Sequence, residues 1–345
     1  MTTTDDRAGH PSAAGGSVSV ALVAWDDPEF AALRTAQQAE LRELYGDDDL
    51  GHAMTGDDVT ATVLLRVGGE PVACGALRDV AVAYGRGVGE VKRMFVLPGH
   101  RGRGNSRTVL TELERLARER GWRRLILETG VLQPEAIGLY VRAGYVATEN
   151  FGEYVGVVES RCFAKDLRAQ PRERSAREAG SDAGVVTLAR VAWDDAEARE
   201  LRRSMWTDTT VRYPEVVDLV EAEGGPDVDD ERQGDGVLTT VVARLDGRPV
   251  GCASLRAARD GYPAGSGELK KVFVDDSARG SGVARALLIA IEDDARARGL
   301  TSVVLQTGIR QPEAVGLYAA VGYRPVAPFG PYVGDQLTLC FAKPL

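Results

Sequence analysis

The stretch "VKRMFVLPGHRGRGNSRTVL", residues 91–110, joins an apolar strand-like segment to a helix-like segment through a loop of arginines and glycines. Apolar residues recur at helical spacing after the loop, which places the loop at a helix N-terminus. Free backbone N–H groups and the helix dipole favour an anion there, and glycines let the backbone approach it closely. The stretch therefore predicts a pyrophosphate site.

The glycine pattern excludes two common nucleotide loops. It lacks the Lys-Ser/Thr of a triphosphate loop, and it is not a GxGxxG fingerprint followed by an acidic ribose ligand. Taken alone, a glycine-rich turn is equally compatible with a plain connection between a strand and a helix.

A second copy of the stretch, "LKKVFVDDSARGSGVARALL", lies at 269–288, displaced by 178 residues. The same displacement takes "QPEAIGLY" at 133–140 onto "QPEAVGLY" at 311–318, and Cys74 onto Cys252. Such a constant spacing predicts the same fold twice. Only the segment after "AWDD" breaks it: Trp25 pairs with Trp193 at 168, so the second copy has about ten extra residues before its second strand.

The repeat divides the chain into a flexible tail (1–16), an N-terminal domain (17–166), a linker (167–184) and a C-terminal domain (185–345). The linker is polar, charged and rich in Pro, Gly, Ser and Ala. In the first copy the patterns predict strands near 18–24, 60–67, 72–78, 89–96, 124–129 and 157–165, and helices near 28–44, 104–120 and 133–142. We expect the α/β class, with a twisted mixed sheet in each domain.

Composition narrows the function classes. The net charge is −9 and the basic residues form no long tract, which disfavours nucleic acid. Because we find neither a signal peptide nor a run of ~18 apolar residues, we expect a cytoplasmic protein with no membrane partner. The four cysteines, Cys74, Cys162, Cys252 and Cys340, stand singly in apolar contexts, so we expect reduced core residues and no metal.

Strand, "RGxG" loop, helix, the strand "LILETG" and "QPEAIGLYVRAGY" together resemble the GNAT family of acetyl-CoA-dependent N-acetyltransferases, in two tandem domains. The family's loop reads Arg/Gln-x-x-Gly-x-Gly/Ala; the second copy fits in full, and the first departs at Ser106. The resemblance implies acetyl-CoA as co-substrate, bound by the loop residues Arg101, Gly102, Arg103, Gly104, Asn105, Ser106, Arg279, Gly280, Ser281, Gly282, Val283 and Ala284.

The resemblance also implies contacts with the pantetheine arm. The strand before each loop would splay from its neighbour and pair with pantetheine through the backbones of Met94, Val96, Val272 and Val274. Gln133 and Gln311 occupy a position near the same arm, although "QP" equally suits the start of a helix.

Acetyl transfer to an amine needs an unprotonated amine and a proton for the departing thiolate. No histidine is shared by the two copies. The resemblance gives the general-acid role to Tyr140 and Tyr318. The alternative is a structural role, in which each tyrosine packs its helix onto the sheet.

A base is also required. The resemblance places it, acting through water, at Glu90 and Glu268. The alternative is that these residues are simply solvated at the start of a strand. Alternation puts Glu90, Lys92 and Met94 on one side of their strand. Glu128 is a further candidate, but its counterpart is Gln306, so a duty common to both domains cannot rest there.

The acceptor regions differ between the copies. The segments "NFGEYVG" and "PFGPYVG" can border an acceptor pocket or merely pack and turn. The acidic loops at 45–58 and 208–230 are where we expect contacts with an ammonium group. We expect a small-molecule amine acceptor, and either a monomer or a homodimer. Another acyl or aminoacyl donor, or a non-catalytic acetyl-CoA-binding protein, remain alternatives.

Overall fold

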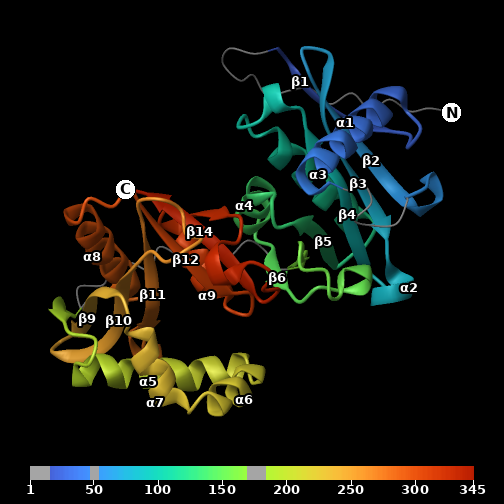
Figure 1. The fold of residues 1–345 in the computed structure, drawn as a ribbon. Helices are drawn as coiled ribbons and strands as arrows, with labels where there is room; N and C mark the ends of the chain where they lie inside the picture. Colours follow the sequence, from blue (N-terminus) through green and yellow to red (C-terminus); the bar gives the residue numbers. More distant parts are fainter. Residues whose placement is uncertain (1–15, 47–53, 169–183) are drawn as a thin grey trace. The chain divides into compact units, whose positions relative to one another are not determined.

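A computed structural model describes residues 16–46, 54–168 and 184–345. The chain forms two compact units, each built on its own seven-stranded sheet (Figure 1). The predicted tail and linker fall almost entirely outside the described residues, so the predicted domain boundaries stay predictions.

The first sheet has the order β1-β2-β3-β4-β5-β7-β6. Only β4 and β5 run parallel; the other neighbours are antiparallel. Its strands are β1 (Val18–Val23), β2 (Val59–Val67), β3 (Glu70–Asp79), β4 (Val88–Val96), β5 (Arg124–Gly130), β6 (Val146–Thr148) and β7 (Ser160–Asp166). The mixed sheet predicted from the sequence is confirmed, and the three-residue β6 is an addition to it.

The second sheet repeats this order, with β11 and β12 as its parallel pair. Its strands are β8 (Val186–Val191), β9 (Val237–Leu245), β10 (Arg248–Ala257), β11 (Ser266–Val274), β12 (Ser302–Gly308), β13 (Arg324–Val326) and β14 (Thr338–Pro344). From β9 onward each strand lies 178 residues after its counterpart, as the repeat predicts.

Helices cover both faces of each sheet. In the first unit they are α1 (Pro28–Tyr45), α2 (Ala81–Tyr84), α3 (Asn105–Glu119) and α4 (Pro134–Arg142). Phe30 and Leu33 of α1 pack against Cys74 of β3. A Cβ on the next residue, Gly75, would instead touch Val109 and Leu113 of α3. Because successive strand residues face opposite sides, α1 and α3 lie on opposite faces.

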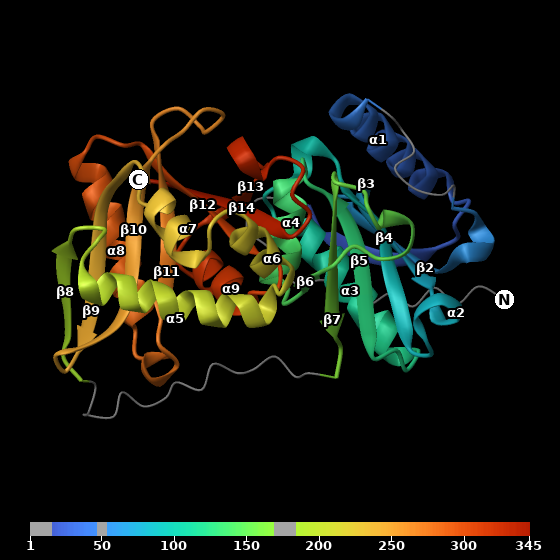
Figure 2. The same cartoon turned by 60° about the horizontal axis from the view of Figure 1, so that its bottom comes forward.

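The second unit contains α5 (Ala196–Arg212), α6 (Glu215–Ala222), α7 (Pro226–Gln233), α8 (Val283–Ala297) and α9 (Pro312–Ala320). Figure 2 shows α5 crossing strands β9 to β11. The segment 208–230, which we expected to be a loop, is largely helical: the end of α5, then α6, then the start of α7. That expectation is wrong because acidic residues such as Glu215, Asp218 and Glu221 lie on the exposed face of a helix, and Pro226 suits a first helical turn.

A β-bulge interrupts the strand before each glycine loop. The register of β4 shifts between Cys74 and Ala76 of β3, and Arg93 has a φ of 56°. In the second sheet, Lys271 has a φ of 52° at the equivalent shift. The extra residue reverses the alternation beyond it. Our prediction that Met94 shares a side with Glu90 and Lys92 is therefore wrong; Met94 reaches the α3 side, beside Gly75.

Candidate active site

The parallel strand pair of each sheet opens before its strands end. Pairing of β4 with β5 stops at Val91 and Leu127, although β4 continues to Val96. Pairing of β11 with β12 stops at Glu268 and Val304, although β11 continues to Val274. The splay implied by the family resemblance is therefore present in both sheets. It exposes a strand edge beside each glycine loop.

The glycine loops lead into helices whose N-termini have no side-chain cap. In the second unit, Gly280 and Gly282 have φ angles of 82° and 88°, and an added Cβ would meet nothing within 4 Å at either. Gly102 and Gly104 repeat this geometry at the start of α3, with φ angles of 73° and 84°. The open space and the uncapped N–H groups fit an anionic group such as a pyrophosphate.

Two of the predicted loop arginines brace the loop. Arg101 donates from Nε to the carbonyl of Val96 at 3.0 Å and forms an ion pair with Glu40 at 2.5 Å. Arg279 donates to the carbonyl of Val274 at 3.3 Å and pairs with Asp276 at 2.6 Å. Their guanidinium groups thus hold the loop against the end of the strand.

The remaining loop residues divide by exposure. Arg103 and Ser281 are exposed, Ser106 and Ala284 are half-buried, and Asn105 and Val283 are buried at the helix start. Asn105 donates to the carbonyl of His100 at 2.9 Å, and Ser281 donates to that of Ala278 at 2.5 Å. These two polar side chains therefore shape the loop.

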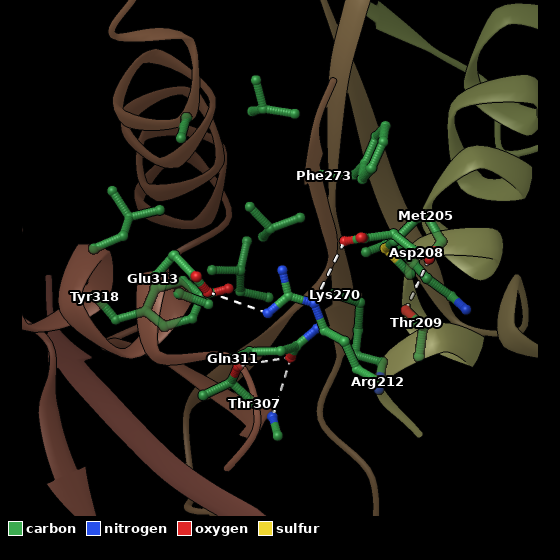
Figure 3. A pocket seen from close by; sticks show the side chains of 18 of the residues that line it. Met205, Asp208, Thr209, Arg212, Lys270, Phe273, Thr307, Gln311, Glu313 and Tyr318 are labelled. Carbon is green, nitrogen blue, oxygen red and sulfur yellow. Dashed lines mark hydrogen bonds and ion pairs between the residues drawn. The ribbon is translucent and has the colours of Figure 1, made fainter. Parts of the chain in front are cut away.

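A cavity of about 870 Å³ lies in the second unit, along the open edge of β11 (Figure 3). Tyr318 and Gln311 stand on one side of it in the figure, and Met205 and Asp208 of α5 on the other. Of the predicted coenzyme and catalytic residues, those lining the cavity are Val272, Val274, Arg279, Gly280, Gly282, Val283, Ala284, Gln311 and Tyr318. The glycine loop, the splayed strand and the tyrosine thus share one cavity.

The segment after "AWDD", where the copies differ in length, also lines this cavity. Its contributors include Asp208, Thr209, Arg212, Tyr213 and Val216. Arg212 is held by Asp208 at 3.8 Å and by Glu313 at 3.2 Å. The end of α5 and the start of α6 therefore shape the wall opposite Tyr318.

The repeated tyrosines occupy equivalent positions in the two units. Tyr318 packs edge-on against Tyr323, with ring centroids 5.8 Å apart, and Tyr140 packs on Tyr145 at the same distance. Burial raises the pKa of both Tyr140 and Tyr318 well above that of a free phenol. Each phenol therefore carries its proton at neutral pH.

Several of the predicted pantetheine-contacting residues already form hydrogen bonds within the chain. Met94 already accepts a hydrogen bond from Gln37 at its carbonyl, at 3.0 Å. Gln311 accepts from the backbone N–H of Gly308 and from the Thr307 hydroxyl, both at 3.2 Å, so its amide oxygen caps the end of β12. The carbonyl of Gln133 accepts from the N–H groups of Ala136 and Ile137 in the first turn of α4.

The repeated carboxylates have different surroundings. Glu268 is fully buried and does not line the cavity. Its Oε2 accepts from Arg256 Nε at 2.9 Å and from the Tyr262 hydroxyl at 3.0 Å, and its Oε1 accepts from the Tyr332 hydroxyl at 2.6 Å. Both oxygens are thus satisfied by donors.

Glu90 is also buried, but it lines a separate cavity of about 430 Å³ in the first unit. Its Oε2 pairs with Arg78 at 2.6 Å, while its Oε1 accepts no hydrogen bond and lies 3.5 Å from Lys92 Nζ. Tyr154, which corresponds to Tyr332, accepts a hydrogen bond from Lys92, as Tyr332 does from Lys270, but Glu90 Oε1 receives no hydrogen bond. The same residue types therefore form two different networks.

Sequence reasoning missed Lys270. This lysine lines the large cavity, and its Nζ lies 3.0 Å from the Tyr332 hydroxyl and 3.7 Å from Glu268 Oε1. A signal was available, because only five of the 42 basic residues are lysines, and Lys92 and Lys270 fall at repeated positions.

The described residues contain no group of three or more His, Cys, Asp or Glu side chains arranged to hold a metal ion. None of their helices combines the length and the apolar character needed to cross a membrane.

Residues 21–145 and 196–323 each match the family model described as Acetyltransferase (GNAT) family. IAA acetyltransferase of Azospirillum brasilense is 40% identical over 128 residues, which make up 37% of this chain and 82% of that protein. Both matched segments contain a glycine loop and one of the repeated tyrosines.

Solved structures of similar proteins align with just under half of the chain. IAA acetyltransferase from Bacillus cereus aligns with 17% identity over 47% of this chain and 100% of its own, with a TM-score of 0.36. PaiA N-acetyltransferase from Thermoplasma acidophilum, in complex with coenzyme A, aligns with 14% identity over 47% of this chain and 99% of its own, with a TM-score of 0.37.

Proposed function

The chain belongs to the GNAT acetyltransferase family, with two copies of the family domain, and on that premise we propose that it is an N-acetyltransferase. The acetyl group of acetyl-CoA is transferred to a small-molecule amine by direct attack in a ternary complex. The cavity that joins the second glycine loop to Tyr318 is the observation that carries this proposal.

In the second unit, different residues bind different parts of acetyl-CoA. Uncapped N–H groups at the start of α8, together with Gly280 and Gly282, bind the pyrophosphate. The open edge of β11 at Val272 and Val274 receives the pantetheine arm. Acetyl-CoA supplies the thioester carbon that the amine attacks.

Repeated residues take the acid and base roles. Tyr318 gives a proton to the departing sulfur; burial raises its pKa, so the phenol is protonated when the reaction begins. The carboxylate positions Glu90 and Glu268 supply the base that the family resemblance implies. Tyr140, with the loop at 101–106, performs the equivalent steps in the first unit.

Calorimetric titration of acetyl-CoA into the full chain tests the coenzyme sites. Gly282→Glu and Gly104→Glu place bulk and negative charge in each loop. Their matched controls are Gly247→Glu and Gly69→Glu, because these glycines also have positive φ and open surroundings but lie in strand-to-strand turns. The controls separate backbone strain from blockage of the site.

We expect two binding sites in the wild-type chain, each removed by the change in its own loop and kept in the matched control. One site removed by only one loop change would restrict coenzyme binding to that unit. Failure of the wild-type chain to bind acetyl-CoA would refute the proposed function.

A further inference from the structure

Lysine is scarce in this chain and its positions are informative. The chain has five lysines. Four of them form two repeated pairs, Lys92 with Lys270 and Lys165 with Lys343, and Lys271 is the fifth. Lys165 and Lys343 each contact both oxygens of a buried glutamate, Glu114 or Glu292, at 2.7–2.8 Å. The other pair lies where the parallel strands separate.

Lys270 lines the large cavity where the parallel strands separate. It follows the last paired residue of β11, Glu268, by two positions, and Gln306 follows its partner Val304 by two positions on β12. Both Lys270 and Gln306 line the cavity, as does Tyr318. The ammonium group of Lys270 is thus held in the space where the strands diverge.

Glu268 lies behind Lys270 and is less accessible to a substrate. Its side chain has no exposed surface, whereas that of Lys270 is 20% exposed. An acceptor that enters the cavity therefore meets Lys270 first. Tyr332 connects the two, since it donates to Glu268 and accepts from Lys270.

The electrostatic surroundings favour the neutral amine of Lys270. Burial is the main cause that lowers its pKa, to about 8; Glu268 opposes this effect, and the cations Arg256, Lys271 and Arg259 add to it. At the position of Gln306 the first unit has Glu128, a buried carboxylate on which Lys92 acts electrostatically. Replacement of that carboxylate by an amide leaves Lys270 with one compensating charge fewer.

We propose that neutral Lys270 is the group that takes the proton from the acceptor's ammonium in the C-terminal unit, with Glu268 and Tyr332 as positioning residues. This inference rests on the proposed function and moves the base of that unit from Glu268 to Lys270. Its geometric support is the shared cavity that Lys270 and Tyr318 line.

The protons balance. The acceptor ammonium gives one proton to Lys270, which later releases it to solvent. The free amine attacks, so that a C–N bond forms and the C–S bond breaks. Tyr318 protonates the sulfur, and the second proton lost by the amine nitrogen restores the tyrosine. The products are an amide and free CoA.

The kinetic test uses the full chain carrying Tyr140→Phe, which removes the proposed acid of the first unit. Thiol release from acetyl-CoA is measured with benzylamine, tyramine and spermidine as acceptors between pH 6 and 10. The variants are Lys270→Met, Lys270→Arg and Gln306→Glu. Lys343→Arg is the control, because it changes a lysine of the same unit that pairs with Glu292.

We expect Lys270→Met and Lys270→Arg each to lower kcat/KM at pH 7.5 by about 100-fold, with Lys343→Arg within about twofold. Gln306→Glu should move the rise of kcat/KM with pH to higher pH, because a carboxylate near Lys270 favours its charged form. Retention of activity in Lys270→Arg would overturn the inference, since an arginine preserves charge and pairing but cannot act as the base.

A second measurement needs no acceptor. Trace labelling of the folded chain with dinitrofluorobenzene, followed by mass spectrometry, reports how each of the five lysines titrates. We expect the reactivity of Lys270 to rise near pH 8. A midpoint near pH 10.5, or no labelling at any pH, would overturn the inference. Absence of thiol release with every amine, despite acetyl-CoA binding and a midpoint near pH 8, would instead refute the proposed function.

Discussion

The hydroxyl of Tyr332 lies 2.6 Å from Oε1 of Glu268 and is the hydrogen-bond donor to that oxygen. The ring stands edge-on to Phe329, with centroids 5.5 Å apart, which holds the hydroxyl in place. Burial, and next the charge of Glu268, raise the pKa of Tyr332 well above that of a free phenol. The tyrosine therefore remains a donor to this buried carboxylate.

We expect Tyr332→Phe to lower the free energy of unfolding by about 1–3 kcal/mol, because the oxygen Oε1 of the buried Glu268 loses its hydrogen-bond donor. Urea unfolding of the full chain, followed by tryptophan fluorescence, measures the loss. Tyr154→Phe is the matched variant and should cost less, since Glu90 Oε1 accepts no hydrogen bond in the first place. Equal losses would contradict the prediction, because the hydrogen bond from Tyr332 to Glu268 would then add no stability beyond what Tyr154 contributes.

The repeated tyrosines give a separate prediction about activity. Tyr318→Phe removes the proposed proton donor while the ring and its packing on Tyr323 and Phe341 remain. We expect kcat of the second unit to fall by about 100-fold with little change in acetyl-CoA affinity. Thiol-release kinetics and calorimetry check the two parts. A normal rate in the double variant with Tyr140→Phe would assign both tyrosines to packing alone.

The cysteines should be inert in the folded chain. All four are free and buried, as the sequence predicts. Burial raises the pKa of Cys74, Cys162 and Cys252 to about 12, which leaves almost no reactive thiolate at pH 8. Cys74 and Cys252 also point toward the carbonyl oxygens of Arg93 and Lys271, at 3.5 Å. We expect a thiol-disulfide reagent to modify none of them within minutes until a denaturant is added; fast reaction of native protein would contradict this.

Much of the architecture could be predicted from the sequence, because local signals repeat at a constant spacing. The glycine loops, most of the strands and the positions of Tyr140 and Tyr318 all follow from patterns a few residues long. Each pattern reports directly on backbone conformation or periodicity. Agreement between two copies strengthened each pattern, as with the strands around Cys74 and Cys252.

The bulge at Arg93 and Lys271 could not be predicted in this way. Arginine and lysine rarely adopt a positive φ, so the residue types at these positions do not indicate a bulge. One added residue reverses every later side chain, which is why Met94 was assigned to the wrong face. The helices α6 and α7 were also missed, because each is only eight residues long and acidic residues interrupt its apolar positions.

The different networks of Glu90 and Glu268 were also invisible to sequence patterns. Arginine, glutamate, lysine and tyrosine repeat identically at these positions. In both copies the lysine donates to the tyrosine hydroxyl. The networks differ because Tyr332 also donates to Glu268, whereas Glu90 Oε1 accepts no hydrogen bond. Only three-dimensional contacts distinguish a satisfied carboxylate from one that faces a cavity.

Lys270 links the site to the pH dependence of stability. Its pKa is about 8 in the folded chain, below the 10.5 of an ordinary lysine, and burial is the main cause. Between these values the unfolded chain binds more protons than the folded one, so this lysine makes stability rise as pH increases from about 8 to about 10.5. Below pH 8 its buried charge costs a constant amount.

Lys270→Met removes both the charge and this titration. We expect the free energy of unfolding of the variant, minus that of wild type, to be about 2–3 kcal/mol larger at pH 7 than at pH 10. The reason is that only wild type gains stability over that interval. Urea unfolding of both proteins at the two pH values gives the difference, in which titrations common to both cancel. Gln306→Glu should reduce the wild-type dependence, since an added carboxylate compensates the ammonium charge. A difference that stays constant from pH 7 to 10 would mean that Lys270 keeps an ordinary pKa in the folded chain and is charged when an acceptor arrives.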